Sequence, residues 1–181
     1  MSNLKPLKSV EHVTNEYTKR ILSYSIGKDP IQVLSETPSK LKKFLKGLSK
    51  EQLTKRPGKN KWSITEIISH LGDTEMIMGF RIRFSLSESG SPLQPIEQDD
   101  WVKNHRYNSR NVSDALKAFT ALRKFHVSLY SSLTKNEMER FGIHQQRGKE
   151  TVEFMIRLVA GHDLNHVMQL ETLRKKWLAK K

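Results

Sequence analysis

The recurrence of apolar residues at helical spacing is the feature that most constrains this fold. In four long segments, apolar residues stand three or four positions apart, which places them on one face of a helix. No stretch alternates apolar and polar residues for long enough to predict a sheet. The pattern therefore predicts an all-α chain, with long helices at about residues 10–26, 64–87, 113–133 and 151–177.

Local signals mark the ends of several of these helices. Residues 63–66, with sequence SITE, form a capping box, and Trp62 and Ile67 flank it as a hydrophobic staple. Gly27 is expected to stop the first helix, because glycine readily adopts the left-handed conformation that ends helices. The capping box gives the most clearly specified helix start in the chain.

Two stretches between the long helices are expected to be irregular. Asp29-Pro30 and Thr37-Pro38 each read as a cap followed by a proline at the first helical position, which predicts short helices broken by turns. Residues 88–111 contain two prolines and show little periodicity. A connection of this length in a compact domain often has a functional role.

Length and cysteine content limit the class of protein. A chain of 181 residues is expected to form one domain, 1–181, with a short basic tail at about 178–181. The chain has no cysteine, so imidazole and carboxylate groups must hold any metal ion, and no protein thiolate is available as a nucleophile. Neither a signal peptide nor a membrane-spanning run is recognisable, which predicts a soluble cytoplasmic protein that does not enter membranes.

The net charge of +13 predicts an attraction for anions. The basic residues are scattered, however, with clusters at 40–50, 55–61 and 174–176. No basic stripe interleaved with aromatic residues and no helix-turn-helix spacing is present, so nucleic acid is not the expected partner. A small-molecule substrate is expected instead.

Two histidines in the last predicted helix suggest a metal site. His162 and His166 occupy the apolar row, one turn and about 40° apart around the axis, so both imidazoles point into the bundle. The two histidines do not belong to a zincin motif, because Asp163 stands where that motif has glutamate. His70, on the predicted helix 64–87, can supply a third imidazole, and three histidines with one open position are typical of a catalytic zinc site. His126 and Asp73 remain alternative third ligands, although His126 is better interpreted as a core histidine.

Four further residues are candidates for roles around such a site. Asp73 either orients His70 or carries a proton, unless it pairs with a basic side chain on the helix surface. Trp101 and Tyr107 either wall a pocket or anchor the long loop, and Arg81, on the helical line of His70, either meets an anion or reaches solvent. The other histidines, His12, His105 and His144, are expected to be exposed, and Gln169 is interpreted as structural.

Four sequence blocks carry a resemblance to a known family. These are KWSITEIISHLGDTE, QDDWVKNHRY after RIRFSL, FGIHQQRGKETV and AGHDLNHVMQLETLR. With them the chain resembles the DinB-like (YfiT-like) superfamily, in particular its small DinB-2-type branch, over about residues 29–174. The resemblance implies a four-helix bundle with a long crossover connection and short extra helices. It also implies a divalent metal held by His70, His162 and His166.

The family's properties extend these expectations. Its metals are usually zinc or nickel, and several members form dimers, which makes a homodimer one expectation for this chain. Some relatives use a low-molecular-weight thiol cosubstrate such as bacillithiol or mycothiol, and others are described as metal-dependent hydrolases. The sequence therefore predicts a metal-dependent thiol transferase or hydrolase. The rival hypothesis is a non-catalytic basic module that binds nucleic acid or a protein partner.

Overall fold

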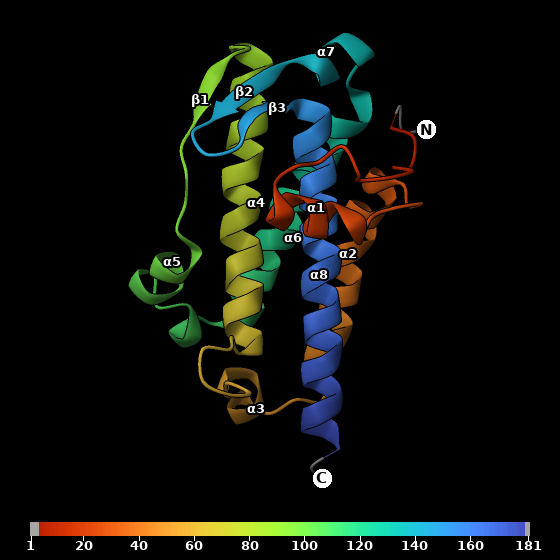
Figure 1. Ribbon diagram of the computed structural model, residues 1–181. Helices are drawn as coiled ribbons and strands as arrows, with labels where there is room; N and C mark the ends of the chain where they lie inside the picture. The colour runs from red at the N-terminus through yellow and green to blue at the C-terminus, as the bar shows by residue number, and fades with distance from the viewer. Residues whose placement is uncertain (1–3, 180–181) are drawn as a thin grey trace.

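Four long helices form the frame of the protein (Figure 1). In the computed structural model, which describes residues 4–179, they are α2 (Pro30–Leu45), α4 (Ile64–Ser87), α6 (Val112–Ser132) and α8 (Val152–Leu178). Three of them begin and end within two residues of the positions predicted from apolar spacing. The expected four-helix bundle is confirmed.

The bundle has an uncommon order of neighbours. α4 packs against α6 and α8, and α2 packs against the same two helices. Helices that follow each other along the chain, α2 and α4 or α6 and α8, therefore lie across the diagonals. α4 and α6 both run upward in Figure 1, whereas α2 and α8 run downward. The connection from α4 to α6 must therefore return along the whole bundle, and it is the expected long crossover.

Short elements connect and cover the long helices. α1 (Glu16–Ser23) lies across α8 near the middle of the bundle (Figure 1). Two short helices and a 3-10 turn complete the lower connections: α3 (Lys50–Thr54), α5 (Gln98–Asn104) and η1 (Tyr107–Ser109). α7 (Lys135–Glu139) follows α6 at the upper end.

A small sheet at the upper end was not predicted. β1 (Ser91–Leu93) pairs in parallel with β2 (Phe141–His144), and β2 pairs in antiparallel fashion with β3 (Gly148–Thr151). The strands have only three or four residues each, so they are too short to leave a clear alternating pattern in the sequence. The sheet ties the crossover segment to the hairpin that precedes α8.

The prediction of broken helices at residues 29–45 was wrong. Asp29 caps α2 as expected, but the helix continues through Pro38 to Leu45. Proline lacks the N–H that would bond to the carbonyl of Leu34, four residues earlier. That carbonyl instead accepts a hydrogen bond from Arg123 of α6, at 3.2 Å. A tertiary contact therefore compensates for the missing helical bond.

The first helix is also shorter than expected. α1 begins at Glu16, where the side chain of Asn15 accepts a hydrogen bond from the N–H of Thr18, and it ends at Ser23. Gly27 has a φ of +73° and lies in the turn that follows. Apolar spacing alone extended this helix because Val10 belongs to the same apolar cluster without being helical.

Polar side chains separate two apolar clusters along the bundle. The upper cluster includes Met78 of α4 and Val159 of α8, and the lower cluster includes Leu71 and Val167 of the same helices. Between them lies a layer of buried polar groups, which contains the residues His70, Glu75, Arg123, His126, His162, Asp163 and His166. The burial of so many ionisable groups at one level distinguishes this part of the molecule from an ordinary apolar core.

Candidate metal centre

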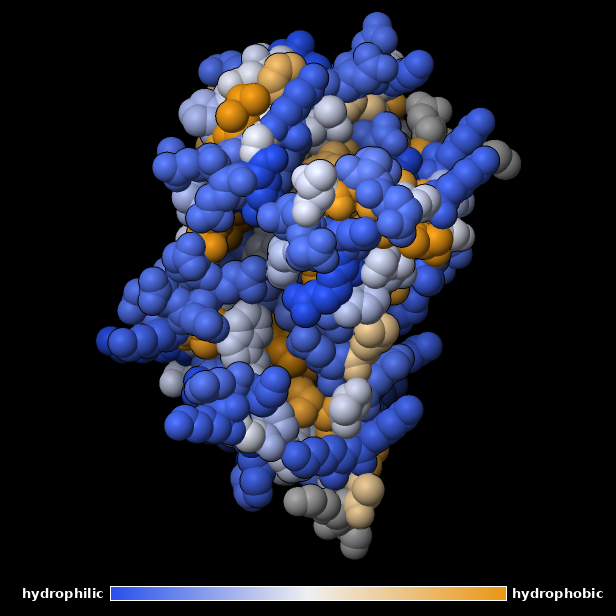
Figure 2. Space-filling model, in the orientation of Figure 1, coloured by the Kyte–Doolittle hydropathy of each residue, from blue (hydrophilic) through white to orange (hydrophobic). Residues whose placement is uncertain are grey.

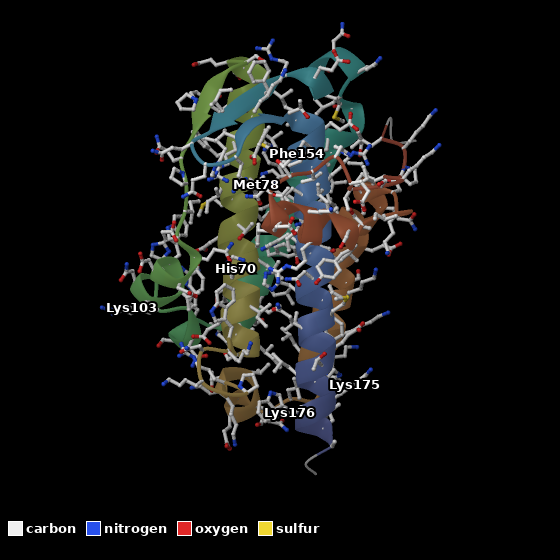
Figure 3. The ribbon with its side chains drawn as sticks, viewed as in Figure 1. His70, Met78, Lys103, Phe154, Lys175 and Lys176 are labelled. Atoms are coloured by element: carbon white, nitrogen blue, oxygen red, sulfur yellow. The ribbon has the colours of Figure 1, made fainter. Side chains whose placement is uncertain are left out.

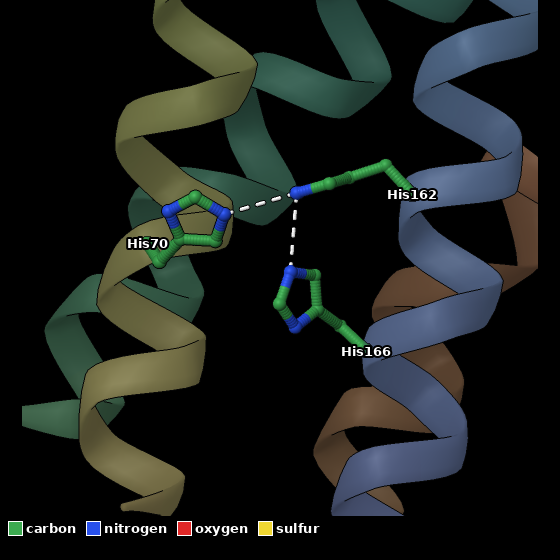
Figure 4. Close-up of side chains that lie close together, drawn as sticks. All are labelled: His70, His162 and His166. Atoms are coloured by element: carbon green, nitrogen blue, oxygen red, sulfur yellow. Dashed lines mark hydrogen bonds between the residues drawn. The ribbon is translucent and has the colours of Figure 1, made fainter. Parts of the chain in front are cut away.

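Three imidazoles converge between α4 and α8 (Figure 4). The Nε2 atom of His162 lies 2.9 Å from Nε2 of His70 and 3.1 Å from Nε2 of His166. All three side chains are buried, and their potential ligand atoms lie within 4.8 Å of one another. We refer to His70, His162 and His166 as the histidine triad.

The frame that holds the histidine triad follows from the sequence of each helix. The capping box of Ser63 and Glu66 is formed, and it fixes the start of α4 less than two turns before His70. On α8, His162 and His166 share the inward row with apolar residues of both clusters. Because α4 and α8 are antiparallel neighbours, their middle turns face each other, and His70 points from α4 toward α8 (Figure 3).

Burial keeps the histidine triad neutral. It lowers the pKa of His162 to about 4, with a further contribution from the charge of Arg123, and it lowers the pKa of His166 to about 3. Burial, followed by the repulsion of the other two rings, lowers the pKa of His70 well below its usual value. Neutral imidazoles carry the free lone pairs that a metal ion requires.

Hydrogen bonding within the histidine triad is incomplete without a cation. Nδ1 of His166 lies 3.0 Å from the side-chain oxygen of Gln169 and donates to it, so Nε2 of His166 carries a lone pair. His162 can offer only one Nε2 proton to the two neighbouring nitrogens. A divalent ion would accept all three lone pairs at once.

The two close separations within the histidine triad also fit a metal ion. A tetrahedral zinc ion holds nitrogens at about 2.0–2.1 Å, which sets them about 3.3 Å from one another. The two observed separations, 2.9 and 3.1 Å, differ from this value by a few tenths of an ångström. The donor set and its spacing are therefore suited to a divalent metal.

Neighbouring groups fix the orientation of the rings. The indole of Trp62 is parallel to His166, at a centroid distance of 6.2 Å, and lies 4.8 Å from His70. The hydroxyl of Thr74 lies 3.4 Å from Nε2 of His70. Gln169, interpreted from the sequence as structural, is the hydrogen-bond acceptor that orients His166. Nothing in its sequence context indicated this contact, because it depends on the side-chain conformation.

A buried ionic network adjoins the histidine triad. Arg123 of α6 donates to Glu75 of α4 at 2.7 Å and to both carboxylate oxygens of Asp163 of α8. His126, once an alternative metal ligand, lies 2.8 Å from Glu75 and belongs to this network, which confirms its interpretation as a core histidine. Burial alone would raise the pKa of Glu75, but Arg123 and His126 outweigh it and lower that pKa to about 2.

Asp73 is paired at the edge of the site. It accepts hydrogen bonds from Arg110 at 2.8 and 3.1 Å and from the hydroxyl of Tyr107 at 2.8 Å. Burial acts to raise the pKa of Asp73, but the bonds from Arg110 and Tyr107 outweigh it, so the pKa is lowered. Pairing of Asp73 with a basic side chain was the alternative that the sequence left open. A role of Asp73 in catalysis stays a prediction.

One cleft of about 820 Å³, measured out to its open mouth, leads to the histidine triad. His70 and His162 lie on its wall, and so do the three predicted pocket residues, Arg81, Trp101 and Tyr107. On the face shown in Figure 2, the surface is hollowed between the crossover segment and α1. The structure therefore brings all of these candidates to one cavity.

The sequence did not predict the contribution of the β2–β3 hairpin to this cleft. His144, expected to be exposed, is 3% exposed, and Gln146 and Arg147 also line the cleft. The hairpin folds over the upper part of α4, so a polar segment of sequence becomes a wall of the cavity. His12 and His105 are exposed, as expected.

Comparison with known proteins identifies the family. The family model described as the DinB superfamily matches residues 34–170. The chain belongs to the DinB superfamily. A "putative metal-dependent hydrolase" from Oceanobacillus iheyensis is 27% identical over 149 residues, which cover 81% of this DinB-superfamily chain and 86% of the relative. A protein of the same description from Geobacillus thermodenitrificans is 25% identical over 151 residues, covering 82% and 84% of the two chains.

A solved structure shares the fold of this DinB-superfamily protein. YfiT from Bacillus subtilis, described as a probable metal-dependent hydrolase with an unusual four-helix bundle topology, superimposes with a TM-score of 0.78. The match covers 95% of this chain and 94% of YfiT, at 22% sequence identity. Within residues 4–179, none of the helices combines the length and the apolar character that crossing a membrane requires.

Proposed function

We propose that this protein is a metal-dependent hydrolase whose divalent ion is held by His70, His162 and His166. The convergence of three neutral, buried imidazoles, two of which lie on the wall of an open cleft, is the observation that supports this proposal most strongly. The descriptions of the relatives from Oceanobacillus and Geobacillus agree with it. Zinc and nickel are the ions we expect, because both accept imidazole ligands.

Each residue of the site has a part in this proposal. The chemistry that such an ion supplies is a lower pKa for water or for a thiol, so that a nucleophile is available near neutral pH. Gln169 holds the proton of His166 on Nδ1 and leaves Nε2 free, and Trp62 restrains the rings of His70 and His166. The hydroxyl of Thr74 lines the cleft beside His70 and can donate a hydrogen bond to a substrate.

Metal analysis of purified variants tests the ligand set. Replacement of His70, His162 or His166 by alanine is expected to abolish stoichiometric zinc or nickel binding, whereas His12→Ala, at an exposed position, retains it. Gln169→Leu is expected to weaken metal affinity about 10- to 100-fold, since it removes the acceptor that orients a ligand. Unchanged metal content in the His162 variant would refute the assignment.

Activity measurements identify the nucleophile. Hydrolysis of 4-nitrophenyl esters by the metal-loaded protein, with loss of turnover in all three alanine variants, is expected if water attacks. Because the chain has no cysteine, any thiol must arrive as a cosubstrate. Turnover that requires an added thiol would assign the protein to the thiol transferases. If the metal-loaded protein turns over neither class but binds DNA or RNA with strong salt dependence, the basic binding module replaces this proposal.

A further inference from the structure

The upper end of the cleft contains a buried cation. Arg81 lies on the same side of α4 as His70, eleven residues further along, which corresponds to a rise of about 16 Å. The residue is 9% exposed. One arm of the guanidinium donates to the backbone carbonyl of Gln94, and the other lies 3.7 Å from the sulfur of Met78. Neither partner carries a negative charge.

Arg81 has no carboxylate partner in the part of the chain that the structure describes. Among residues 4–179, the ion pairs within 4.0 Å include none that involves Arg81. Burial, followed by repulsion from Arg147, lowers the pKa of Arg81, and Glu150 offsets this effect only in part. A buried charge without a counter-ion is costly, so an arginine in this state is suited to pair with an anion from outside the chain.

The groups around Arg81 define the charge of the anion. Arg147 of the hairpin also lines the cleft, but its guanidinium is paired with the buried carboxylate of Glu150 at 2.5 Å. Two arginines and one carboxylate leave a single net positive charge. This balance favours a monoanionic carboxylate over a phosphate dianion, because the dianion would leave a negative charge uncompensated in a partly buried site.

His144 supplies a neutral donor at the same end. Its Nδ1 accepts a hydrogen bond from the backbone N–H of Gln146 at 3.2 Å, so its proton is on Nε2. Between this end and the histidine triad, the wall of the cleft carries the apolar side chains of Ile77, Met78 and Leu158. The cleft therefore presents donors at one end, an apolar middle and imidazoles at the other end.

We propose that the substrate is an elongated molecule with a carboxylate that binds Arg81, an apolar segment, and a hydrolysable acyl bond that reaches the histidine triad. Half-esters and half-amides of medium-chain dicarboxylic acids represent this class. The inference rests on the proposed hydrolase function for the reacting end. In the hydrolysis, the oxygen of water bonds to the acyl carbon and the acyl C–O or C–N bond breaks. The alcohol or amine leaves with one proton of the water, and the new carboxylic acid releases the other proton as it becomes a second carboxylate.

Paired chromogenic esters test the proposal with the metal-loaded protein. Mono-(4-nitrophenyl) adipate has a free carboxylate, and 4-nitrophenyl hexanoate has the same acyl length without it. Arg81→Met is expected to raise KM for the adipate ester about 10- to 100-fold, the range for a lost charge-assisted hydrogen bond, and to raise KM for the hexanoate ester much less. Arg81→Lys is expected to recover part of the loss. Equal effects on both esters, or no effect on either, would overturn the proposal.

Two further measurements separate this site from the proposed hydrolysis. Lys103→Met removes an exposed positive charge from α5, which lies away from α4 and α8 in Figure 3. This variant is expected to hydrolyse both esters as the unmodified protein does. Binding of the free hexanoate anion, which has a carboxylate but no ester, is then measured by calorimetry in the His162→Ala and Arg81→Met proteins. Binding that survives in the former and is lost in the latter supports the carboxylate site even if no ester is hydrolysed. The opposite pattern would place the anion at the imidazoles and refute the inference.

Discussion

Replacing Arg123 by leucine should strongly destabilise the fold. Arg123 is 1% exposed. Its guanidinium is hydrogen-bonded to the buried carboxylates of Glu75 and Asp163 and to the carbonyl of Leu34 that Pro38 leaves without a helical partner. Breaking one buried ion pair by removing a partner costs about 3–5 kcal/mol, and an unsatisfied buried carbonyl costs about 1–3 kcal/mol. These costs do not add in full, because the two carboxylates can take up protons and thereby lose their charge.

We therefore expect Arg123→Leu to lower the free energy of unfolding by at least about 4 kcal/mol, a large share of the 5–15 kcal/mol typical of a domain. For a chain of this size the loss corresponds to a fall in Tm of about 8–16 °C. Urea unfolding followed by circular dichroism measures the change. Arg157→Leu on α8 is the control: its pair with Glu153 is partly exposed, and its removal is expected to cost less than about 1 kcal/mol.

A triple variant separates charge from packing. Adding Glu75→Gln and Asp163→Asn to Arg123→Leu removes the uncompensated negative charges and is expected to recover at least half of the lost stability. A single variant that loses less than about 1 kcal/mol would refute the reasoning. So would a triple variant no more stable than the single one, since the cost would then lie in the lost volume of the arginine.

Two other predictions concern close packing and pH. Gly79→Ala places a Cβ 2.0 Å from the buried ring of His126 and should lower the free energy of unfolding by about 1–3 kcal/mol. A Cβ at Gly72 lies 3.7 Å from its nearest neighbour, so Gly72→Ala should stabilise α4 by up to about 1 kcal/mol. Urea unfolding at pH 7.5 measures both variants, and equal effects would contradict the prediction. Burial lowers the pKa of the histidine triad in the folded state, to about 4 and about 3 for its α8 members, so the metal-free protein keeps full stability above pH 6.5. Below that pH the imidazoles take up protons in the unfolded chain before they do so in the folded protein. Each imidazole then lowers the free energy of unfolding by up to about 1.4 kcal/mol per pH unit. A free energy of unfolding that stays constant from pH 7 to 5 would refute this.

Helical periodicity was sufficient to predict the frame of the site. The start of α4 follows from the capping box at Ser63, a local signal that requires no tertiary contact. The inward direction of His162 and His166 follows from the same local geometry, because residues four apart on a helix share a face. The family resemblance and the helical phase both indicated His70 as the third imidazole, and the structure brings the three rings together.

Local patterns failed where a distant residue satisfies a local deficit. Thr37-Pro38 reads as a helix break, and α2 continues only because Arg123 of α6 bonds to the carbonyl of Leu34. An arginine such as Arg123 is usually expected at the protein surface, and nothing near it in the sequence indicates that Glu75 and Asp163 lie beside it. His144 is likewise buried only because the hairpin folds over α4.

The sequence by itself determined the helices, the face each one buries and the chemical type of the candidate ligands, because these depend on the periodicity of the backbone. Only the tertiary structure decided which charges are buried together and which are buried beside neutral groups. The ionic network around Arg123 and the guanidinium of Arg81, which forms no ion pair with a carboxylate in residues 4–179, belong to this second group. Burial and ion pairing depend on residues of different helices that the packing of the bundle brings close together. The spacing of apolar residues along one helix does not predict these contacts.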